Sequence, residues 1–280
     1  AMAYTMEECK DMYLRGRASG KIFFVGQQRL FDTKYIKIMD AVRSGEFGPV
    51  VNVRNYWYRN HDWRREVPSP EYERHINWRL YREYSRGLMT ELACHQLQNG
   101  TWALGMLPSQ VMGTGNIIYW KDGREVFDSV STIYTFPNGV NMTFESVISN
   151  KHFGMGEYIM CKDATVDLAN GRLYMEDPKP RSGIRQLVGD IEQGIFSNSV
   201  FAGTSWSAEN ASSDPGVSIM PDAAGDGSIE MLQAFCHSIL TGRQPDHVLE
   251  EAYYGSILCL LGDEAILQQK TLSFPEHLKI

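Results

Sequence analysis

A carboxylate and an imidazole stand four residues apart in the segment 84–96, which reads YSRGLMTELACHQ. Glu91 and His95 follow Gly87, and side chains at this spacing share one face of a helix. Imidazole titrates near neutral pH, and a neighbouring carboxylate fixes its tautomer and stabilises its charged form. The pair is therefore a candidate for proton transfer. The same spacing also arises by chance at surfaces and core edges, so a purely structural pair stays open as the alternative.

The overall composition excludes several other classes of function. The chain has 280 residues, 43% of them hydrophobic and 22% charged, which is typical of a globular protein with a substantial core. Its net charge of -7 provides no basic field for nucleic acid. No apolar stretch is long enough to span a bilayer, and the acidic N-terminal residues are unlike a signal peptide. We therefore expect a cytoplasmic protein without nucleic-acid or membrane partners.

The cysteines favour reduced thiols. Their number is odd, their spacing is wide, and no Cys-x-x-Cys occurs among Cys9, Cys94, Cys161, Cys236 and Cys259. Cys94 precedes His95, but neighbours on a helix point apart, so a Cys-His nucleophile is not favoured. We predict no disulfide and no metal site.

Apolar periodicity and turn residues predict the elements that position Glu91 and His95. Helices are predicted over Met6–Ala18 with Thr5 as cap, Thr33–Ser44, the Glu91/His95 segment to about Leu104, Ser228–Leu240 and Leu249–Gln269. Strands are predicted over Lys21–Gly26, Val50–Arg59, Val111–Tyr119, Asp128–Phe136, Val140–Ile148, Glu157–Cys161, Ala164–Leu168 and Gly171–Glu176. Hairpin turns are indicated at Asp122-Gly123, Pro137-Asn138-Gly139 and Asn170-Gly171, and a long exposed loop over Ser205–Gly227. The predicted fold class is α+β, with a large, mostly antiparallel open sheet flanked by helices.

Aromatic and polar residues are unusually dense between Tyr56 and Tyr84. Aromatic faces cover the C–H surfaces of sugars, while arginine, asparagine and histidine bond hydroxyl groups, so one interpretation is a loop lining a carbohydrate-sized pocket. The other is a loop whose aromatic side chains only fasten it to the core. Both interpretations stay open.

An ordered set of short motifs resembles a known family. The set comprises Phe24-Val25-Gly26-Gln27-Gln28-Arg29, Ser44-Gly45-Glu46-Phe47-Gly48-Pro49-Val50, Gly87-x-x-x-Glu91-x-x-x-His95, Trp102-x-x-Gly105-x-x-Pro108 and Thr241-Gly242-Arg243-Gln244-Pro245. With these motifs in this order, the chain resembles the Gfo/Idh/MocA family of NAD(P)-dependent sugar and inositol oxidoreductases. The subgroup that it resembles most carries Asn77-Trp78, Tyr84-Ser85 and Trp120-Lys121-Asp122-Gly123-Arg124-Glu125. The resemblance covers nearly the whole chain.

The resemblance implies that the chain is the C-terminal part of such an enzyme. Family members begin with a nucleotide-binding domain whose Gly-rich turn lies over the cofactor pyrophosphate. Gly154-x-Gly156 lacks the third glycine, and the family's Glu-Lys-Pro motif would fall just before Met2. We expect residues 1–31 to be a remnant helix and strand of that Rossmann domain, and residues 32–280 to be the substrate-binding and oligomerisation domain. The implied cofactor of the full-length family is NAD or NADP, with none bound by this chain.

The resemblance also implies roles for individual residues. His95 matches the histidine that acts as acid and base on the substrate hydroxyl, and Glu91 stands where aspartate is common. Removing hydride from a sugar carbon requires that the hydroxyl proton be taken up, which such a pair can do near pH 7. Arg29 would face the cofactor cleft, with a surface arginine in a turn as the alternative. The residues expected to bind substrate are Trp57, Trp63, Asn77, Trp78, Tyr84 and Arg86.

Three functions are compatible with these observations. The first is the C-terminal part of an oxidoreductase acting on a sugar or cyclitol hydroxyl, inactive alone because the cofactor motif and catalytic lysine are absent. The second is a non-catalytic dimerisation or ligand-binding module that forms a homo-oligomer through its sheet. In the strand 128–136, Tyr134 and Phe136 make one face more aromatic, which indicates one covered face. The third is a fragment of an NAD-dependent glycosidase or lyase of the same family.

Overall fold

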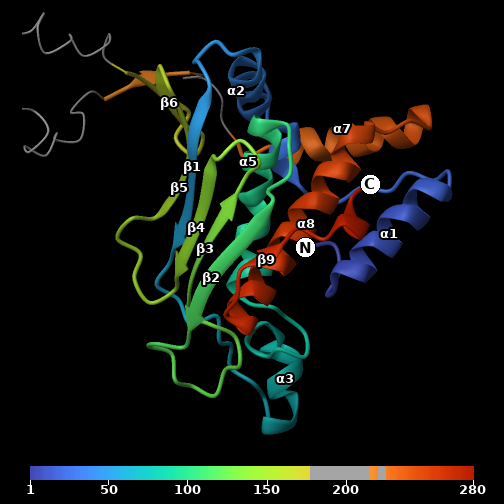
Figure 1. Cartoon of the computed structure of the whole chain (residues 1–280). Helices are drawn as coiled ribbons and strands as arrows, with labels where there is room; N and C mark the ends of the chain where they lie inside the picture. Colours follow the sequence, from blue (N-terminus) through green and yellow to red (C-terminus); the bar gives the residue numbers. More distant parts are fainter. Residues whose placement is uncertain (177–214, 220–224) are drawn as a thin grey trace, which may run out of the picture.

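One mixed sheet organises the protein (Figure 1). The structure, a computed structural model, describes residues 1–176, 215–219 and 225–280. In these residues the sheet has nine strands in the order β8-β7-β6-β5-β1-β4-β3-β2-β9. Their bounds are β1 Val50–Tyr58, β2 Gln110–Asn116, β3 Ser129–Thr135, β4 Asn141–Val147, β5 Met155–Cys161, β6 Ala164–Asp167, β7 Arg172–Met175, β8 Val217–Ser218 and β9 Leu272–Ser273. The neighbours β1 and β4 run parallel and the other described neighbours antiparallel, which confirms the predicted fold class.

The long helices gather on one side of the sheet and leave the other side open (Figure 1). The helices are α1 Met6–Ala18, α2 Thr33–Ser44, α3 Glu73–Ile76, α4 Leu88–Glu91, α5 Leu97–Leu104, α7 Ser228–Thr241 and α8 Asp246–Gln268. Short 3-10 turns are η1 Gln28–Phe31, η2 Pro70–Tyr72, η3 Trp78–Leu80, η4 Ala93–His95 and η6 Glu276–Leu278. The fold is therefore two layers, with the main core between the helices and one face of the sheet.

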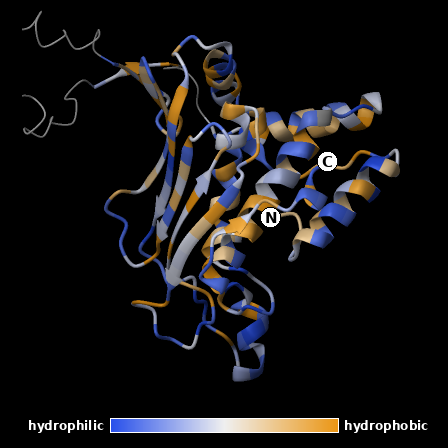
Figure 2. Cartoon of the chain, viewed as in Figure 1, coloured by the Kyte–Doolittle hydropathy of each residue, from blue (hydrophilic) through white to orange (hydrophobic). Residues whose placement is uncertain are grey.

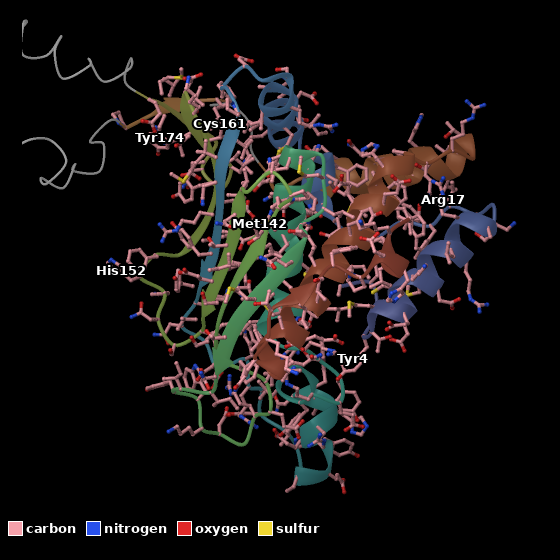
Figure 3. The ribbon with its side chains drawn as sticks, viewed as in Figure 1. Tyr4, Arg17, Met142, His152, Cys161 and Tyr174 are labelled. Atoms are coloured by element: carbon pink, nitrogen blue, oxygen red, sulfur yellow. The ribbon has the colours of Figure 1, made fainter. Side chains whose placement is uncertain are left out.

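Alternation along the strands separates the two faces, as the mixed colours along each strand show (Figure 2). In β3, Tyr134 is fully buried whereas its neighbour Ile133 is 39% exposed, which confirms one covered and one open face. Met142 of β4 points into the helical layer (Figure 3). A Cβ atom on Gly100 of α5 would lie 2.3 Å from the Met142 sulfur, so only glycine permits this close approach of α5 to the sheet.

The start of α1 and the end of α2 form as the sequence predicts. Thr5 and Glu8 form a capping box, in which the Thr5 N–H donates to the Glu8 carboxylate at 2.9 Å and the Glu8 N–H donates to the Thr5 hydroxyl at 3.2 Å. Gly45 ends α2 with φ of 81°, a left-handed conformation that favours glycine. The hairpin turns Pro137-Asn138-Gly139 and Asn170-Gly171 also form between antiparallel strands. Most of the predicted loop Ser205–Gly227 lies outside the described residues.

Two predictions from the sequence are wrong, namely the strand over residues 21–26 and the tight hairpin at Asp122-Gly123. Residues 21–26 form no strand, because no described strand lies beside them to pair with. Instead the Phe23 N–H donates to the Gln244 side chain at 2.7 Å, and Phe24 packs against Phe31 and Phe235. The region expected to be a remnant of a nucleotide-binding domain therefore contains the predicted helix but not the predicted strand. Asp122-Gly123 is not a tight hairpin either, because it lies within the long connection 117–128 between β2 and β3.

The prediction of one continuous helix that carries both Glu91 and His95 is also wrong. It is divided into α4, η4 and α5, and the dividing residues Leu92 and Gln96 have φ of -120° and -117°. The buried Gln96 side chain donates to the carbonyl oxygens of Tyr56 and Gly156, at 3.2 Å each. These two bonds tie the segment to β1 and β5, and we attribute the break in the helix to them. The i,i+4 argument for a shared helix face therefore does not apply.

Candidate functional site

His95 is held from two sides by side chains of distant segments. Its ring lies 6.0 Å from the Trp57 ring in an edge-on arrangement, measured between ring centroids. Its backbone carbonyl accepts a hydrogen bond from the Arg29 guanidinium. The Nδ1 atom of His95 is buried and has no hydrogen-bond partner among the described residues. A buried polar atom without a partner costs free energy unless a ligand or water satisfies it, which marks His95 as a functional candidate.

Glu91 is bound to an arginine and not to His95. Arg79 donates from Nε to the Glu91 carboxylate at 2.9 Å, and the Glu91 side chain is the less exposed of the two. Within the described part of the chain, no hydrogen bond or ion pair joins Glu91 to His95. The divided helix explains this separation. Any joint action of the two groups must therefore pass through a ligand or through Arg79.

A pocket of about 510 Å³ lies where β1 and β4 end, beside Trp57. We call it the Trp63 pocket, and its lining residues are Tyr58, Arg59, Asn60, His61, Trp63, Arg79 and Lys151. The Arg59 guanidinium carbon is 5.4 Å from the centroid of the Trp57 ring, which in turn meets His95. Arg79, which also lines the pocket, forms an ion pair with Glu91. The pocket is therefore linked to Glu91 through Arg79, and to His95 through Arg59 and Trp57.

A buried ion pair that the sequence interpretation missed lies behind His95. The Arg29 Nη1 atom is 2.8 Å from Oε1 of Glu157, and the Tyr35 hydroxyl donates to the same carboxylate. Glu157 is fully buried and Arg29 is 8% exposed. Burial raises the pKa of Glu157, and the charge of Arg29 opposes that rise. Burial, followed by the charge of Glu157, raises the pKa of Tyr35.

This cluster places Arg29, the predicted cofactor residue, inside the protein. Its guanidinium donates to the carbonyl of His95 and pairs with the carboxylate of Glu157, so Arg29 holds the two segments together. A role toward a cofactor stays a prediction. The sequence contains one sign of this buried ion pair. Glu157 stands within an otherwise apolar strand, where a carboxylate requires a buried partner.

The remaining predicted residues lie apart from His95. Asn77 is 2% exposed, and its amide bonds the backbone of Arg65 in both directions, at 2.7 and 3.0 Å. Trp78 and Tyr84 are each 39% exposed on the surface of this region. Arg86 is 3.4 Å from Asp263 of α8. The structure thus brings Trp57, Trp63, Glu91 and His95 to one region, and it uses Asn77 and Arg86 to fasten neighbouring segments.

Residues 35–165 match the GFO/IDH/MocA C-terminal domain family. The matched residues include His95, Glu91 and the whole Trp63 pocket, whereas Arg29 lies before them. No curated protein matches the sequence.

Solved structures share the fold of this chain. Levoglucosan dehydrogenase in complex with NADH and L-sorbose superimposes with a TM-score of 0.67 at 15% identity, covering 98% of this chain and 71% of that one. An NAD binding oxidoreductase from Klebsiella pneumoniae gives 0.68 at 12% identity, with coverage of 98% and 72%. The WlbA dehydrogenase from Bordetella pertussis, in complex with NADH and UDP-GlcNAcA, gives 0.66 at 15% identity, with coverage of 98% and 70%. At these identities the likeness concerns the fold.

In the aromatic segment 56–84, some side chains line the Trp63 pocket and others fasten the loop to its surroundings. Trp63 lines the pocket and adopts a positive φ of 63°, a backbone conformation that side chains other than glycine rarely adopt. Arg64 fastens the loop, since it bonds Glu73 and lies 3.2 Å from Asp122. Arg124 adds a bond to the Asp62 carbonyl at 2.7 Å. A network of ion pairs therefore holds Trp63 at the pocket in spite of its strained backbone.

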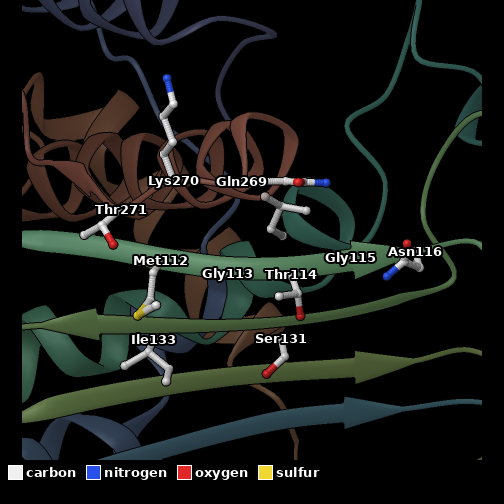
Figure 4. Close-up of a pocket in the computed structure, with 11 residues that line it drawn as sticks. Met112, Gly113, Thr114, Gly115, Asn116, Ser131, Ile133, Gln269, Lys270 and Thr271 are labelled. Carbon is white, nitrogen blue, oxygen red and sulfur yellow. The ribbon is translucent and has the colours of Figure 1, made fainter.

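A second cavity, of about 460 Å³, lies at the edge of the sheet (Figure 4). It is lined by β2, β3 and the end of α8, with Met112, Ile133, Gln269 and Lys270 among its side chains. None of the predicted site residues lines it, and Lys270 is the one titratable side chain in its lining. It therefore offers no acid and base pair, and the Trp63 pocket is the better candidate.

Metal clusters, disulfides and membrane-spanning helices are the remaining features to report for the described residues. No three His, Cys, Asp or Glu side chains among them are grouped so that they could hold a metal ion. The five cysteines are free thiols, in agreement with the prediction from their spacing. No helix in the described part of the chain has the length and apolar character needed to span a membrane.

Proposed function

We propose that this chain supplies the substrate-binding part of an NAD(P)-dependent oxidoreductase acting on a sugar or cyclitol hydroxyl. The observation that carries the proposal is His95, whose Nδ1 is buried without a partner beside Trp57 and the Trp63 pocket. The GFO/IDH/MocA match over residues 35–165 supports it, because it includes these residues. Similar folds include a levoglucosan dehydrogenase in complex with NADH.

His95 takes up the hydroxyl proton in this proposal. An imidazole can accept a proton near neutral pH and return it in the reverse direction. Trp57 fixes the ring from the side, and Arg29 fixes the backbone from behind. Glu91 acts on the same region through Arg79, with which it forms an ion pair. The aromatic side chain of Trp63 covers the apolar surface of the ring of the substrate.

The described residues do not fit a dinucleotide by themselves. Arg29 is engaged with Glu157 and His95, and residues 21–26 form no strand that could lead into a phosphate-binding turn. We therefore derive no step through NAD or NADP. We propose the division at residue 31, with residues 32–280 as the substrate-binding domain, and we expect the chain alone to be inactive.

The test is titration of the whole chain with myo-inositol and D-glucose by NMR, observing the imidazole signals of its histidines. We expect one of these polyols to shift the His95 signals, and the binding to change with pH. His95→Asn abolishes that pH dependence, whereas His277→Asn, at an exposed histidine near Glu7, leaves it unchanged. A folded chain that binds neither myo-inositol nor any sugar, neutral or charged, contradicts the proposal. Micromolar binding of NAD(H) or NADP(H) in calorimetry contradicts the proposed division at residue 31.

We also propose a homo-oligomer that forms through the open face of the sheet. Met112 on β2, Ile133 on β3 and Met160 on β5 are 51%, 39% and 38% exposed, and their pairing through the sheet places them on the same face. Apolar side chains gathered on one exposed face are typical of an interface. A second copy presenting the same face would cover them. Light scattering at several concentrations measures the mass, and a monomer at every concentration contradicts this proposal.

A further inference from the structure

The lining of the Trp63 pocket is cationic. Three of its side chains, Arg59, Arg79 and Lys151, carry positive charge, and no aspartate or glutamate is among the residues that line it. Arg79 is paired with Glu91. Arg59 and Lys151 make no ion pair with any residue in the described part of the chain. Two positive charges in the pocket are therefore not compensated by the protein.

The carboxylates nearest the pocket are already bonded elsewhere. Glu145 accepts a hydrogen bond from the Tyr58 hydroxyl at 2.7 Å. Asp62 accepts from the backbone N–H of Arg64 at 3.0 Å. Glu91 is held by Arg79 at 2.9 Å. In the described part of the chain, none of these three carboxylates forms an ion pair with Arg59 or Lys151, so both cations can pair with a ligand.

The two uncompensated charges come from two strand ends that the sheet holds together. Arg59 follows β1, and its backbone N–H donates to the Val147 carbonyl of β4 at 2.8 Å. Lys151 lies in the loop after β4, where a bridge between Asn60 and Ser149 continues the pairing. The positions of both residues are therefore set by the parallel pair β1 and β4, beside the Trp57 ring that contacts His95.

We propose that the Trp63 pocket selects a sugar or sugar derivative that carries an anionic group, a carboxylate or a phosphate. The inference rests on the proposed function, since it names the substrate class of the same site. Arg59 offers a planar fork of donors and Lys151 a compact charge, which together suit an oxyanion. Trp63 and Tyr58 cover the ring while the anionic group lies between the two cations. The hydroxyl that reacts then lies toward Trp57 and His95.

The test compares sugars that differ at one carbon. D-glucose, D-glucuronate and D-glucose 6-phosphate are titrated into the whole chain by NMR, with inorganic phosphate as a fourth probe. We expect at least one anionic sugar to bind about tenfold more tightly than D-glucose, and the advantage to shrink at high salt. The variant Arg59→Gln/Lys151→Gln loses that advantage. Lys162→Gln, at an exposed lysine outside the pocket, keeps it.

The outcomes separate this inference from the proposed function. Equal binding of D-glucose and both anionic sugars overturns the inference and leaves the proposed function standing. An anionic advantage that survives Arg59→Gln/Lys151→Gln overturns it, because the charge is then recognised elsewhere. Inorganic phosphate binding as tightly as the sugar phosphate also overturns it, because no sugar is then recognised. Failure of every sugar and of myo-inositol to bind a folded chain rejects the proposed function as well.

Discussion

Glu251, on α8, gives the sharpest test of the electrostatics of this fold. Burial raises its pKa to about 7 from 4.5, the charge of Arg43 opposes the rise, and the Thr101 hydroxyl donates to the carboxylate at 3.5 Å. A carboxyl whose pKa is higher in the folded state binds more protons there than in the unfolded state. Its contribution to stability is therefore complete below pH 4.5 and is lost as the pH rises through about 7.

The size of this effect follows from the two pKa values. Their difference, at 1.36 kcal/mol for each pH unit, amounts to about 3 kcal/mol as an upper value. Between pH 5 and pH 8 the free energy of unfolding of the wild type should fall by about 2 to 3 kcal/mol from this group alone. Glu251→Gln keeps the shape and the bond to Thr101 but cannot ionise. It should therefore be more stable relative to the wild type at pH 8 than at pH 5.

Denaturant unfolding of both proteins at pH 5 and pH 8 measures this difference, because the titrations common to the two proteins cancel. Glu264→Gln, a half-buried position on the same helix, is the matched control and should keep the pH dependence of the wild type. If Glu251→Gln differs from the wild type by the same amount at both pH values, the carboxylate is not desolvated as the structure indicates, and the reasoning fails.

Three further predictions concern the site and the sheet. Glu157→Gln should lower the free energy of unfolding by about 3 kcal/mol because it leaves the Arg29 charge buried without its partner, and adding Arg29→Met to it should cost less than the sum of the two single changes in denaturant unfolding. Gly87→Ala should cost about 1 to 3 kcal/mol in the same assay, because φ is 66° there and a Cβ would lie 2.8 Å from Val126; an unchanged unfolding midpoint would contradict the backbone geometry. Ile133→Lys on the open face should convert the proposed oligomer to monomers in light scattering, whereas a mass equal to that of the wild type would place the interface elsewhere.

Local signals in the sequence were sufficient for most of the elements. Thr5 with Glu8 marks the start of α1, Gly45 marks the end of α2, and Pro137-Asn138-Gly139 marks a hairpin, because each of these devices acts within a few residues. The prediction of a strand over residues 21–26 is wrong because strand formation depends on a pairing partner elsewhere in the chain. An apolar run becomes a strand only where a neighbour can pair with it, and that neighbour is not a local property.

The candidate site was predictable in part. The sequence predicts both His95 and Trp57 for the site, and the structure brings their rings together, while their roles stay predictions. The shared helix face of Glu91 and His95 was wrong, because the side chain of Gln96 bonds to two strands and the segment is not a regular helix. A helical spacing argument assumes that no tertiary contact competes with the backbone, and here one does.

The buried cluster behind His95 connects these observations. Glu157 does not line the Trp63 pocket, yet it holds Arg29, and Arg29 holds the His95 backbone. Glu157 is therefore a positioning residue, and its loss should act on the site through the placement of His95 while leaving Arg59 and Lys151 in place. Recognition of the anionic group and placement of the imidazole thus depend on different parts of the fold. Glu157→Gln should change the pH dependence of polyol binding while keeping the preference for anionic sugars, and Arg59→Gln/Lys151→Gln should do the reverse.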